Sequence, residues 1–225
     1  MDLPLEVFRK HLRELSASGR VVSLKSALTR LRSGAGDDRH RLVLTFDDAF
    51  ANFREVILPL LVEYGLPATL YVPTGFIDGD RPSPLGGAED HRPMTWRQLA
   101  DAAATGLVEL GSHSVTHPDL RGLDAEGLRF ELEESRRRIE TETGCRCEGF
   151  CYPRALWSES VRRATSRVYS YAVAAGGRRN RSNGWHPFSL SRHPVRCDMP
   201  ADLAYLTRGE LLVEEWLADR MRRRR

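Results

Sequence analysis

The stretch RLVLTFDD, residues 41–48, decides the fold class of this chain. It is a nearly continuous run of β-favouring residues that ends in two carboxylates. Such a run is typical of a strand buried on both faces, as in a parallel sheet. Similar short runs alternate with segments of helical period along the chain, so the pattern predicts βαβ units and the α/β class. The pattern alone fits an open sheet and a closed barrel equally well.

The other elements follow from periodicity and from stop signals such as Gly65 and Gly144. Strands are expected at 67–72, 107–111, 147–152, 168–175 and 188–195. Helices are expected at 4–17, 50–64, 95–104, 124–144, 156–166 and 201–221. Polar loops are expected at 33–40, 77–93 and 176–187.

Length and composition exclude several classes of protein. A chain of 225 residues with 41% hydrophobic content predicts one globular domain over 1–225, with its core over about 5–196. No apolar run approaches the roughly 18 residues that a membrane span needs. The N-terminus lacks the apolar region of a signal peptide, so a cytoplasmic location is expected unless a leader has been removed. The net charge of +3 and the lack of a basic stripe with aromatics argue against nucleic acid as a partner.

The four cysteines are Cys145, Cys147, Cys151 and Cys197. Their spacing lacks the paired C-x2-C knuckles of structural zinc sites. Free, mostly buried thiols are therefore expected.

Polar residues follow three predicted strands at their carboxyl ends. Asp47 and Asp48 follow the first strand, His113 and His117 follow the strand 107–111, and Tyr152-Pro153-Arg154 follows a later one. The carboxyl ends of parallel strands share one side of an α/β sheet, where active sites form. These groups are therefore expected to converge.

Adjacent carboxylates repel each other unless something compensates, and a divalent cation does so. One carboxylate can then bind the metal while the other acts as a base. His113 and His117 add two imidazoles, which gives a set of two His and one carboxylate with open positions. Two interpretations without a metal site remain: the carboxylates cap the following helix, and the two histidines are surface residues.

Four motifs, in order and spacing, carry a resemblance. Residues 45–50 (TFDDAF) resemble a TFDDG motif, residues 113–118 an H-[ST]-x-x-H-P motif and residues 150–153 an F-x-Y-P motif. Residues 190–195 resemble an L-x-R-x-x-V segment. Together they resemble the polysaccharide deacetylase family (NodB-homology domain, carbohydrate esterase family 4), closest to its exopolysaccharide-modifying branch. The resemblance covers residues 5–196.

The resemblance implies a distorted (β/α) barrel and a divalent metal, usually Zn2+, with Co2+ or Ni2+ also suitable. It implies that Asp48, His113 and His117 bind the metal and that Asp47 is the general base. The backbone N–H of Tyr152 would hold the oxyanion together with the metal.

Some residues depart from the family pattern. Ala49 replaces the usual Gly, which matters if the backbone there needs a positive φ. Phe150 stands where chitin-type members carry an Arg that orients the base. Arg154-Ala155 replaces a P-x-G continuation and is expected to reshape the substrate rim.

The general acid and the substrate contacts are less defined by the motifs. His193 lies one residue beyond the position of the family's usual acid, and His186 is the alternative. Pro153, Arg154 and Trp185 are expected to contact substrate. Trp96 and Trp157 can also stack on sugars, although core or rim packing suits every one of these tryptophans equally well.

The expected function is removal of an N-acetyl group from an N-acetylhexosamine-containing glycan, with an N-acetylated sugar as the partner. The alternatives are an amidase on a small N-acyl substrate and a non-catalytic sugar-binding protein, the latter suggested by Ala49 and by the unclear acid. Two His and one carboxylate also suit a non-haem iron oxygenase. The adjacent base Asp47 argues against that chemistry.

Overall fold

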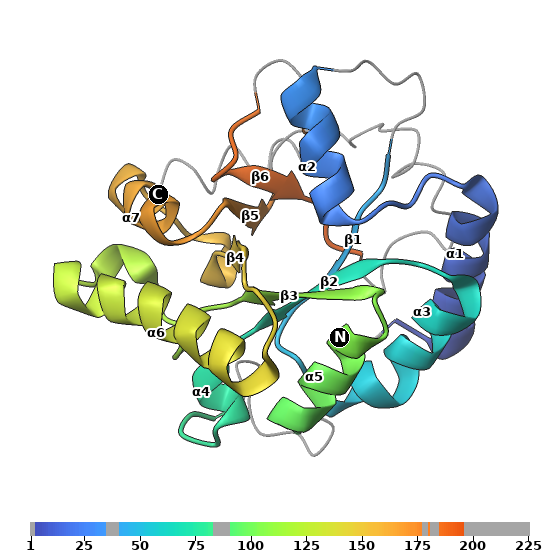
Figure 1. Cartoon of the computed structure of the whole chain (residues 1–225), viewed down its shortest axis with the longest axis horizontal. Helices are drawn as coiled ribbons and strands as arrows, with labels where there is room; N and C mark the ends of the chain where they lie inside the picture. The colour runs from blue at the N-terminus through green and yellow to red at the C-terminus, as the bar shows by residue number, and fades with distance from the viewer. Residues whose placement is uncertain (1–2, 35–40, 83–90, 177–179, 181–184, 196–225) are drawn as a thin grey trace.

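The structure is a computed structural model that describes residues 3–34, 41–82, 91–176, 180 and 185–195. Its centre is a parallel sheet of six strands, which pair in chain order. The strands are β1 (Leu44–Phe46), β2 (Ala68–Val72), β3 (Val108–Ser112), β4 (Gly149–Cys151), β5 (Tyr171–Ala175) and β6 (Leu190–Arg192). The sheet curls with helices around it (Figure 1), which confirms the predicted α/β class and distorted (β/α) barrel.

The strand register aligns all the carboxyl ends at one edge of the sheet. Phe46 pairs with Leu70, Ser112 with Phe150, and Val173 with both Cys151 and Leu190. The residues after β1, β3 and β4 therefore face a common edge. All the strands except β3 are shorter than the predicted segments, and β3 is only shifted by one residue. The segment 168–175, for example, begins before β5 does, with residues that lead into the strand.

The longer helices are α1 (Leu5–Ser18), α2 (Leu24–Ser33), α3 (Leu58–Tyr64), α5 (Trp96–Ala104), α6 (Ala125–Thr143) and α7 (Glu159–Val168). Short ones are η1 (Phe53–Ile57), α4 (Thr74–Ile77), η3 (Leu120–Gly122) and η4 (Pro153–Ala155). The predicted helix 50–64 is divided, since η1 is a π-helical segment that leads into α3. The helix expected at 201–221 and Cys197 lie outside the described residues.

Side-chain caps fix the starts of two helices. The Thr95 side chain accepts a hydrogen bond from the Gln98 N–H, and the Gln98 side chain accepts one from the Thr95 N–H. Asp124 likewise accepts from the Gly127 N–H at 2.8 Å. Caps of this kind satisfy amide donors that a helix start leaves unpaired, so they fix where α5 and α6 begin.

The main core lies between the sheet and its outer helices. Leu61, Leu99 and Leu132 of three different helices and Leu70 and Leu110 of two strands are almost completely buried there. Side chains of a strand alternate in direction. The neighbouring positions therefore point to the inner face of the curled sheet.

The inner face holds a second cluster that includes Tyr71, Tyr171 and Leu190. Glycines make room for the tyrosines: a Cβ on Gly149 would lie 2.2 Å from the Tyr171 hydroxyl oxygen, and one on Gly111 would lie 2.5 Å from Tyr71 Cδ1. Any larger residue at these positions would displace the rings.

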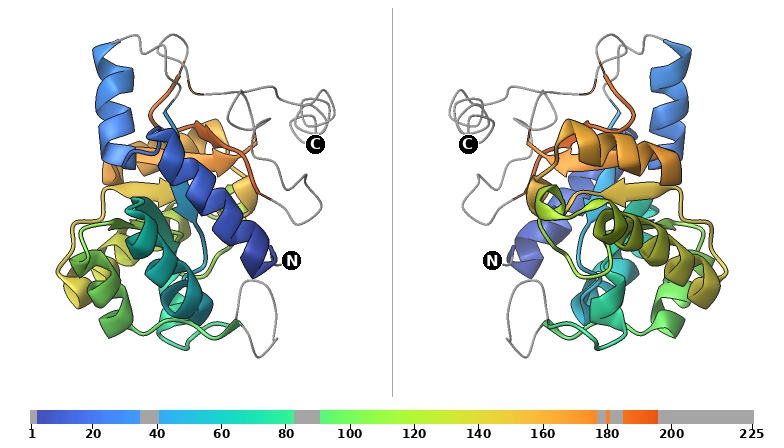
Figure 2. Two further views of the ribbon diagram at one scale, coloured as in Figure 1. Left: turned by 90° about the vertical axis from the view of Figure 1, so that its right-hand side faces the viewer. Right: turned by 90° about the vertical axis from the view of Figure 1, so that its left-hand side faces the viewer.

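Helix α2, for which the sequence predicts no element, also packs on this inner cluster through Leu24 and Leu28. Figure 1 shows α2 beside β6 and β1, and the side views of Figure 2 show it at the top of the molecule. A parallel bridge between Val21 and Leu42 joins the segment before α2 to the segment before β1. This helix therefore covers the inner face near the first and last strands.

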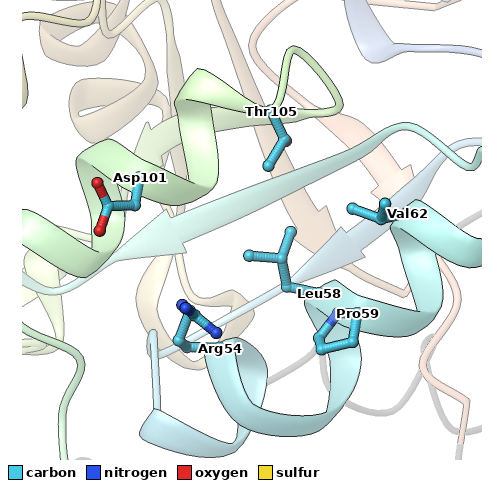
Figure 3. A pocket seen from close by; sticks show the side chains of 6 residues that line it. All are labelled: Arg54, Leu58, Pro59, Val62, Asp101 and Thr105. Atoms are coloured by element: carbon cyan, nitrogen blue, oxygen red, sulfur yellow. The ribbon is translucent and has the colours of Figure 1, made fainter.

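The surface carries a shallow hollow of about 410 Å³ between α3 and α5 (Figure 3). It is lined by Arg54, Leu58, Pro59, Val62, Asp101 and Thr105. None of the residues expected to carry chemistry lines it. None of the helices in the described ranges is long and apolar enough to cross a membrane.

Candidate active site

Asp48, His113 and His117 converge as the sequence predicts. One carboxylate oxygen and one ring nitrogen from each histidine lie within 4.8 Å of one another. The two imidazole rings meet edge to face, with centroids 4.7 Å apart. This is a compact group of one oxygen and two nitrogen donors, the set that suits a divalent metal such as zinc.

A backbone contact fixes the orientation of His113. Its Nδ1 lies 2.8 Å from the Cys151 carbonyl oxygen, and a carbonyl can only accept a hydrogen bond, so the proton belongs on Nδ1. The other nitrogen, Nε2, lies 3.9 Å from Asp48 Oδ1. Its lone pair is therefore free to coordinate a metal, in the arrangement that metal-binding histidines adopt.

The carboxylate of Asp48 shows why a cation fits here. Its Oδ1 is buried and has no hydrogen-bond partner among the described residues. Burial raises the pKa of Asp48, which reflects the cost of an uncompensated charge. Burial and the charges of His113 and Arg154 lower the pKa of His117 to about 4, so its imidazole is neutral at pH 7. A divalent cation would satisfy both side chains.

Asp47 is held by Arg192, a residue to which the sequence assigns no role. Arg192 Nη1 lies 2.8 Å from Asp47 Oδ1, and Nη2 lies 2.8 Å from Oδ2. Burial alone would raise the pKa of Asp47, but the charge and hydrogen bonds of Arg192 outweigh it and leave the pKa below its usual value. Asp47 is therefore ionised at neutral pH, as a proton acceptor must be.

The role of Phe150 needs a correction. Phe150 is fully buried and packs on Tyr152 and Tyr169, so it does not occupy the place of a base-orienting Arg. The next residue, Cys151, points to the base instead, with Sγ 3.8 Å from Asp47 Oδ2 and 2.8 Å from Arg192 Nη2. The small thiol leaves space that the guanidinium from β6 fills.

A second donor set, Asp47, His113 and Cys151, also lies within 4.8 Å. Burial raises the pKa of Cys151 well above its usual value, so this thiol is neutral at pH 7. Metals bind the thiolate. The Asp48 set is therefore the better metal site. The three cysteines in the described ranges are free, with Cys147 and Cys151 buried.

Residues with positive φ angles follow all three strands that deliver polar groups. They are Asp48 and Ala49, Ser114 and His117, and Arg154 and Ala155. Non-glycine residues in this region carry strain of about 1–3 kcal/mol each and gather at functional sites. Ala49, at φ 50°, does occupy a position where glycine would be favoured.

The oxyanion role expected for the Tyr152 backbone also needs a correction. Its N–H donates to the Val173 carbonyl at 3.0 Å, and its hydroxyl donates to the Phe188 carbonyl at 3.0 Å. Both donors belong to the link between β4, β5 and the segment before β6. Tyr152 therefore holds the sheet together rather than facing substrate.

The remaining predicted residues lie around this centre. Pro153 is buried in η4, whereas Arg154 is exposed and its charge acts on His117. Trp185 is partly buried and packs on the inner cluster. The half-buried His193 directly follows Arg192.

The alternative acid, His186, lies elsewhere. It lines a different hollow of about 220 Å³, together with residues of α7. None of the residues of the Asp48 donor set lines that hollow, so the position of His186 does not support it as the acid.

Comparisons with known proteins identify a family and similar folds. A family model described as "Polysaccharide deacetylase" matches residues 34–172. A chitooligosaccharide deacetylase of Rhizobium leguminosarum bv. phaseoli is 30% identical over 142 residues, which are 61% of this chain and 55% of that protein. The chain spans about half the length of the curated relatives it matches.

Two solved structures have a similar fold. A deacetylase of Streptococcus pyogenes, PplD, in complex with acetate, superposes with a TM-score of 0.78 at 21% identity, over 93% of this chain and 88% of that one. A de-N-acetylase from Aggregatibacter actinomycetemcomitans gives 0.73 at 19% identity, over 89% of each chain. Because the family model spans more than half of the 225 residues, including Asp47, Asp48, His113 and His117, the chain belongs to the polysaccharide deacetylase family.

Proposed function

We propose that this chain is a metal-dependent hydrolase that removes an N-acetyl group from an N-acetylhexosamine unit. One observation carries the proposal. The donor set of Asp48, His113 and His117 lies beside a second carboxylate, Asp47, which Arg192 keeps ionised and oriented. Amide hydrolysis needs these two parts together: a place for an electrophilic metal and a base next to it.

Asp48, His113 and His117 would hold the metal. Zn2+ suits two imidazoles and one carboxylate, and Co2+ or Ni2+ can use the same donors. The bound metal supplies Lewis acidity, which polarises the amide carbonyl and lowers the pKa of water to about 7. The protonated Nδ1 of His113, bonded to the Cys151 carbonyl, keeps Nε2 turned towards the site.

Asp47 would take the proton of the attacking water. Each carboxylate oxygen has two lone pairs, so both can bind Arg192 and still accept a further proton. The two-point contact fixes the carboxylate plane. His193 would then protonate the leaving amine.

The sugar class is proposed from the relatives, one of which is described as a chitooligosaccharide deacetylase. The experiment measures acetate release from N-acetylglucosamine oligomers and from small N-acetyl sugars, with added Zn2+ or Co2+. The expected result is metal-dependent release that Asp47→Asn lowers by about 10²–10⁴-fold and that His117→Ala abolishes.

Asp101→Asn is the matched control, because this exposed carboxylate lies on α5 and lines the hollow of Figure 3. It should keep wild-type activity. Release from small sugars alone would favour the small-molecule amidase. If the protein binds zinc but releases acetate from neither class, the proposal would be wrong and the sugar-binding protein would be the alternative to test.

A further inference from the structure

Glu131 of α6 is a buried carboxylate that faces the loop between His113 and His117. It is 5% exposed. Its Oε2 accepts hydrogen bonds from the N–H groups of Val115 at 2.8 Å and Thr116 at 2.9 Å. Its Oε1 accepts from the Thr116 hydroxyl at 2.6 Å. Both carboxylate oxygens thus accept hydrogen bonds from two adjacent residues of one loop.

No cation among the described residues forms an ion pair with Glu131. Buried carboxylates without a partner are rare, because the charge costs several kcal/mol to remove from water. Here the three donors of the loop compensate the charge. An apolar residue would suit the surrounding core better, so the carboxylate is explained by what it does to the loop.

The loop needs support because its backbone is strained. Ser114 has a φ of 69° and His117 a φ of 55°. The Ser114 hydroxyl accepts from the His117 N–H at 3.0 Å, and the Ser112 hydroxyl accepts from the Ser114 N–H at 3.2 Å. Strained residues persist only where surrounding contacts over-determine them.

A second contact of α6 reinforces the first. The Ser112 hydroxyl lies 2.7 Å from that of Ser135, one turn beyond Glu131, and Ser135 in turn donates to the Glu131 carbonyl at 2.7 Å. Glu131 and Ser135 therefore hold the segment 112–117 from one face of the helix.

We infer that Glu131 is a positioning residue, which sets the distance and orientation between the His113 and His117 side chains and thereby the metal affinity of the site. The inference rests on the proposed metal-dependent function. Groups that orient metal ligands typically change metal affinity by 10–100-fold when they are removed. A carboxylate on α6 would thus tune a site whose ligands all follow β-strands.

The test compares Glu131→Ala and Glu131→Gln with wild type. Zinc affinity is measured by competition with a chromophoric chelator, and the visible spectrum of the Co2+ form reports ligand geometry. Glu131→Ala is expected to weaken zinc binding at least about 10-fold and to change the Co2+ spectrum. Glu131→Gln should lose less, since its amide oxygen can still accept from both N–H groups.

Glu133→Ala is the matched control, because Glu133 is exposed on the same helix. It should bind zinc as wild type does. Should Glu131→Ala fail to fold, Thr116→Val decides, because it removes one of the three hydrogen bonds at nearly constant volume. A several-fold loss of zinc affinity is expected.

Wild-type zinc affinity and an unchanged Co2+ spectrum in Glu131→Ala, or in Thr116→Val where it is used, would overturn the inference alone. A wild-type protein that binds no divalent metal would overturn both this inference and the proposed function. A wild-type protein that binds zinc, responds to Glu131→Ala and releases no acetate would overturn the proposed function only.

Discussion

The guanidinium of Arg192 and the carboxylate of Asp47 form a two-point ion pair with both N···O distances at 2.8 Å. The pair joins the end of β6 to the residue that follows β1, the two strands furthest apart in the sheet order. Arg192 also donates to the Thr45 hydroxyl at 3.1 Å. The curled sheet is thus linked across its first and last strands at the candidate active site.

Replacing Arg192 is expected to lower kcat while the metal stays bound. Arg192→Ala should cost about 100-fold, because a base displaced by about 1 Å loses that much. Arg192→Lys should recover only part of the lost kcat, since an ammonium cannot contact both carboxylate oxygens in a plane. Steady-state kinetics with metal analysis of each variant checks this. Arg137→Ala, which breaks an exposed ion pair with Glu134, should leave kcat unchanged.

Removing the metal is expected to lower stability as well as activity. Dialysis against a chelator should abolish acetate release, and zinc at 100 times its Kd should restore about 2.7 kcal/mol of unfolding free energy. Asp48→Ala should show no stabilisation by zinc, because the Asp48 carboxylate is part of the donor set. Thermal unfolding with and without zinc measures both. Equal stabilisation of Asp48→Ala and wild type would place the metal elsewhere.

Ala49 tests the strained turn after β1. It is fully buried at φ 50°. Ala49→Gly should change the unfolding free energy by less than about 1 kcal/mol, because relief of strain offsets the lost methyl group and the freer unfolded chain. Ala49→Val should lose at least about 2 kcal/mol, since a branched residue fits neither the space nor the φ angle. Urea unfolding checks both, with exposed Ala104→Val as the control. Equal stability of the Val and Gly variants would contradict the turn geometry.

The thiols should differ in reactivity. Cys145 is partly exposed, whereas Cys147 is buried and burial raises its pKa to about 12. Iodoacetamide should therefore modify Cys145 in the folded protein and reach Cys147 and Cys151 only after unfolding. Peptide mass mapping before and after denaturant distinguishes the sites. Rapid labelling of Cys147 in the native protein would show that the packing around β4 is looser than described.

The sequence predicts most of the fold, because each element carries a local signal. Apolar runs in the sequence mark five of the six strands. The sixth, β6, lies within the less apolar segment 188–195. Thr95 and Asp124 fix two helix starts through local hydrogen bonds. Helix α2 is missed, although Ser23 caps its start, its leucines recur at helical spacing and Gly34 ends it.

The metal donors are predictable for a similar reason: strand ends place Asp48, His113 and His117 together. Arg192 and Glu131 are not, because neither directly follows a predicted strand: Arg192 stands inside the expected strand 188–195 and Glu131 inside the expected helix 124–144. Arg192 lies beyond the residues 34–172 that the family model matches. Glu131 lies in a helix that contains many charged residues. It differs from Glu133 in being buried, which the sequence does not show. Phe150 is assigned the position of the base-orienting Arg, whereas the adjacent Cys151 faces Asp47, because neighbouring residues of a strand point to opposite faces.

The link between β6 and β1 also sets an order of events during synthesis of the chain. A nascent chain that has left the ribosome as far as Cys151 already carries Asp48, His113, His117 and the carbonyl that orients His113. Asp47 still lacks its guanidinium at that stage, because Arg192 is made later. The groups that can capture a metal are thus complete before the group that prepares the base arrives.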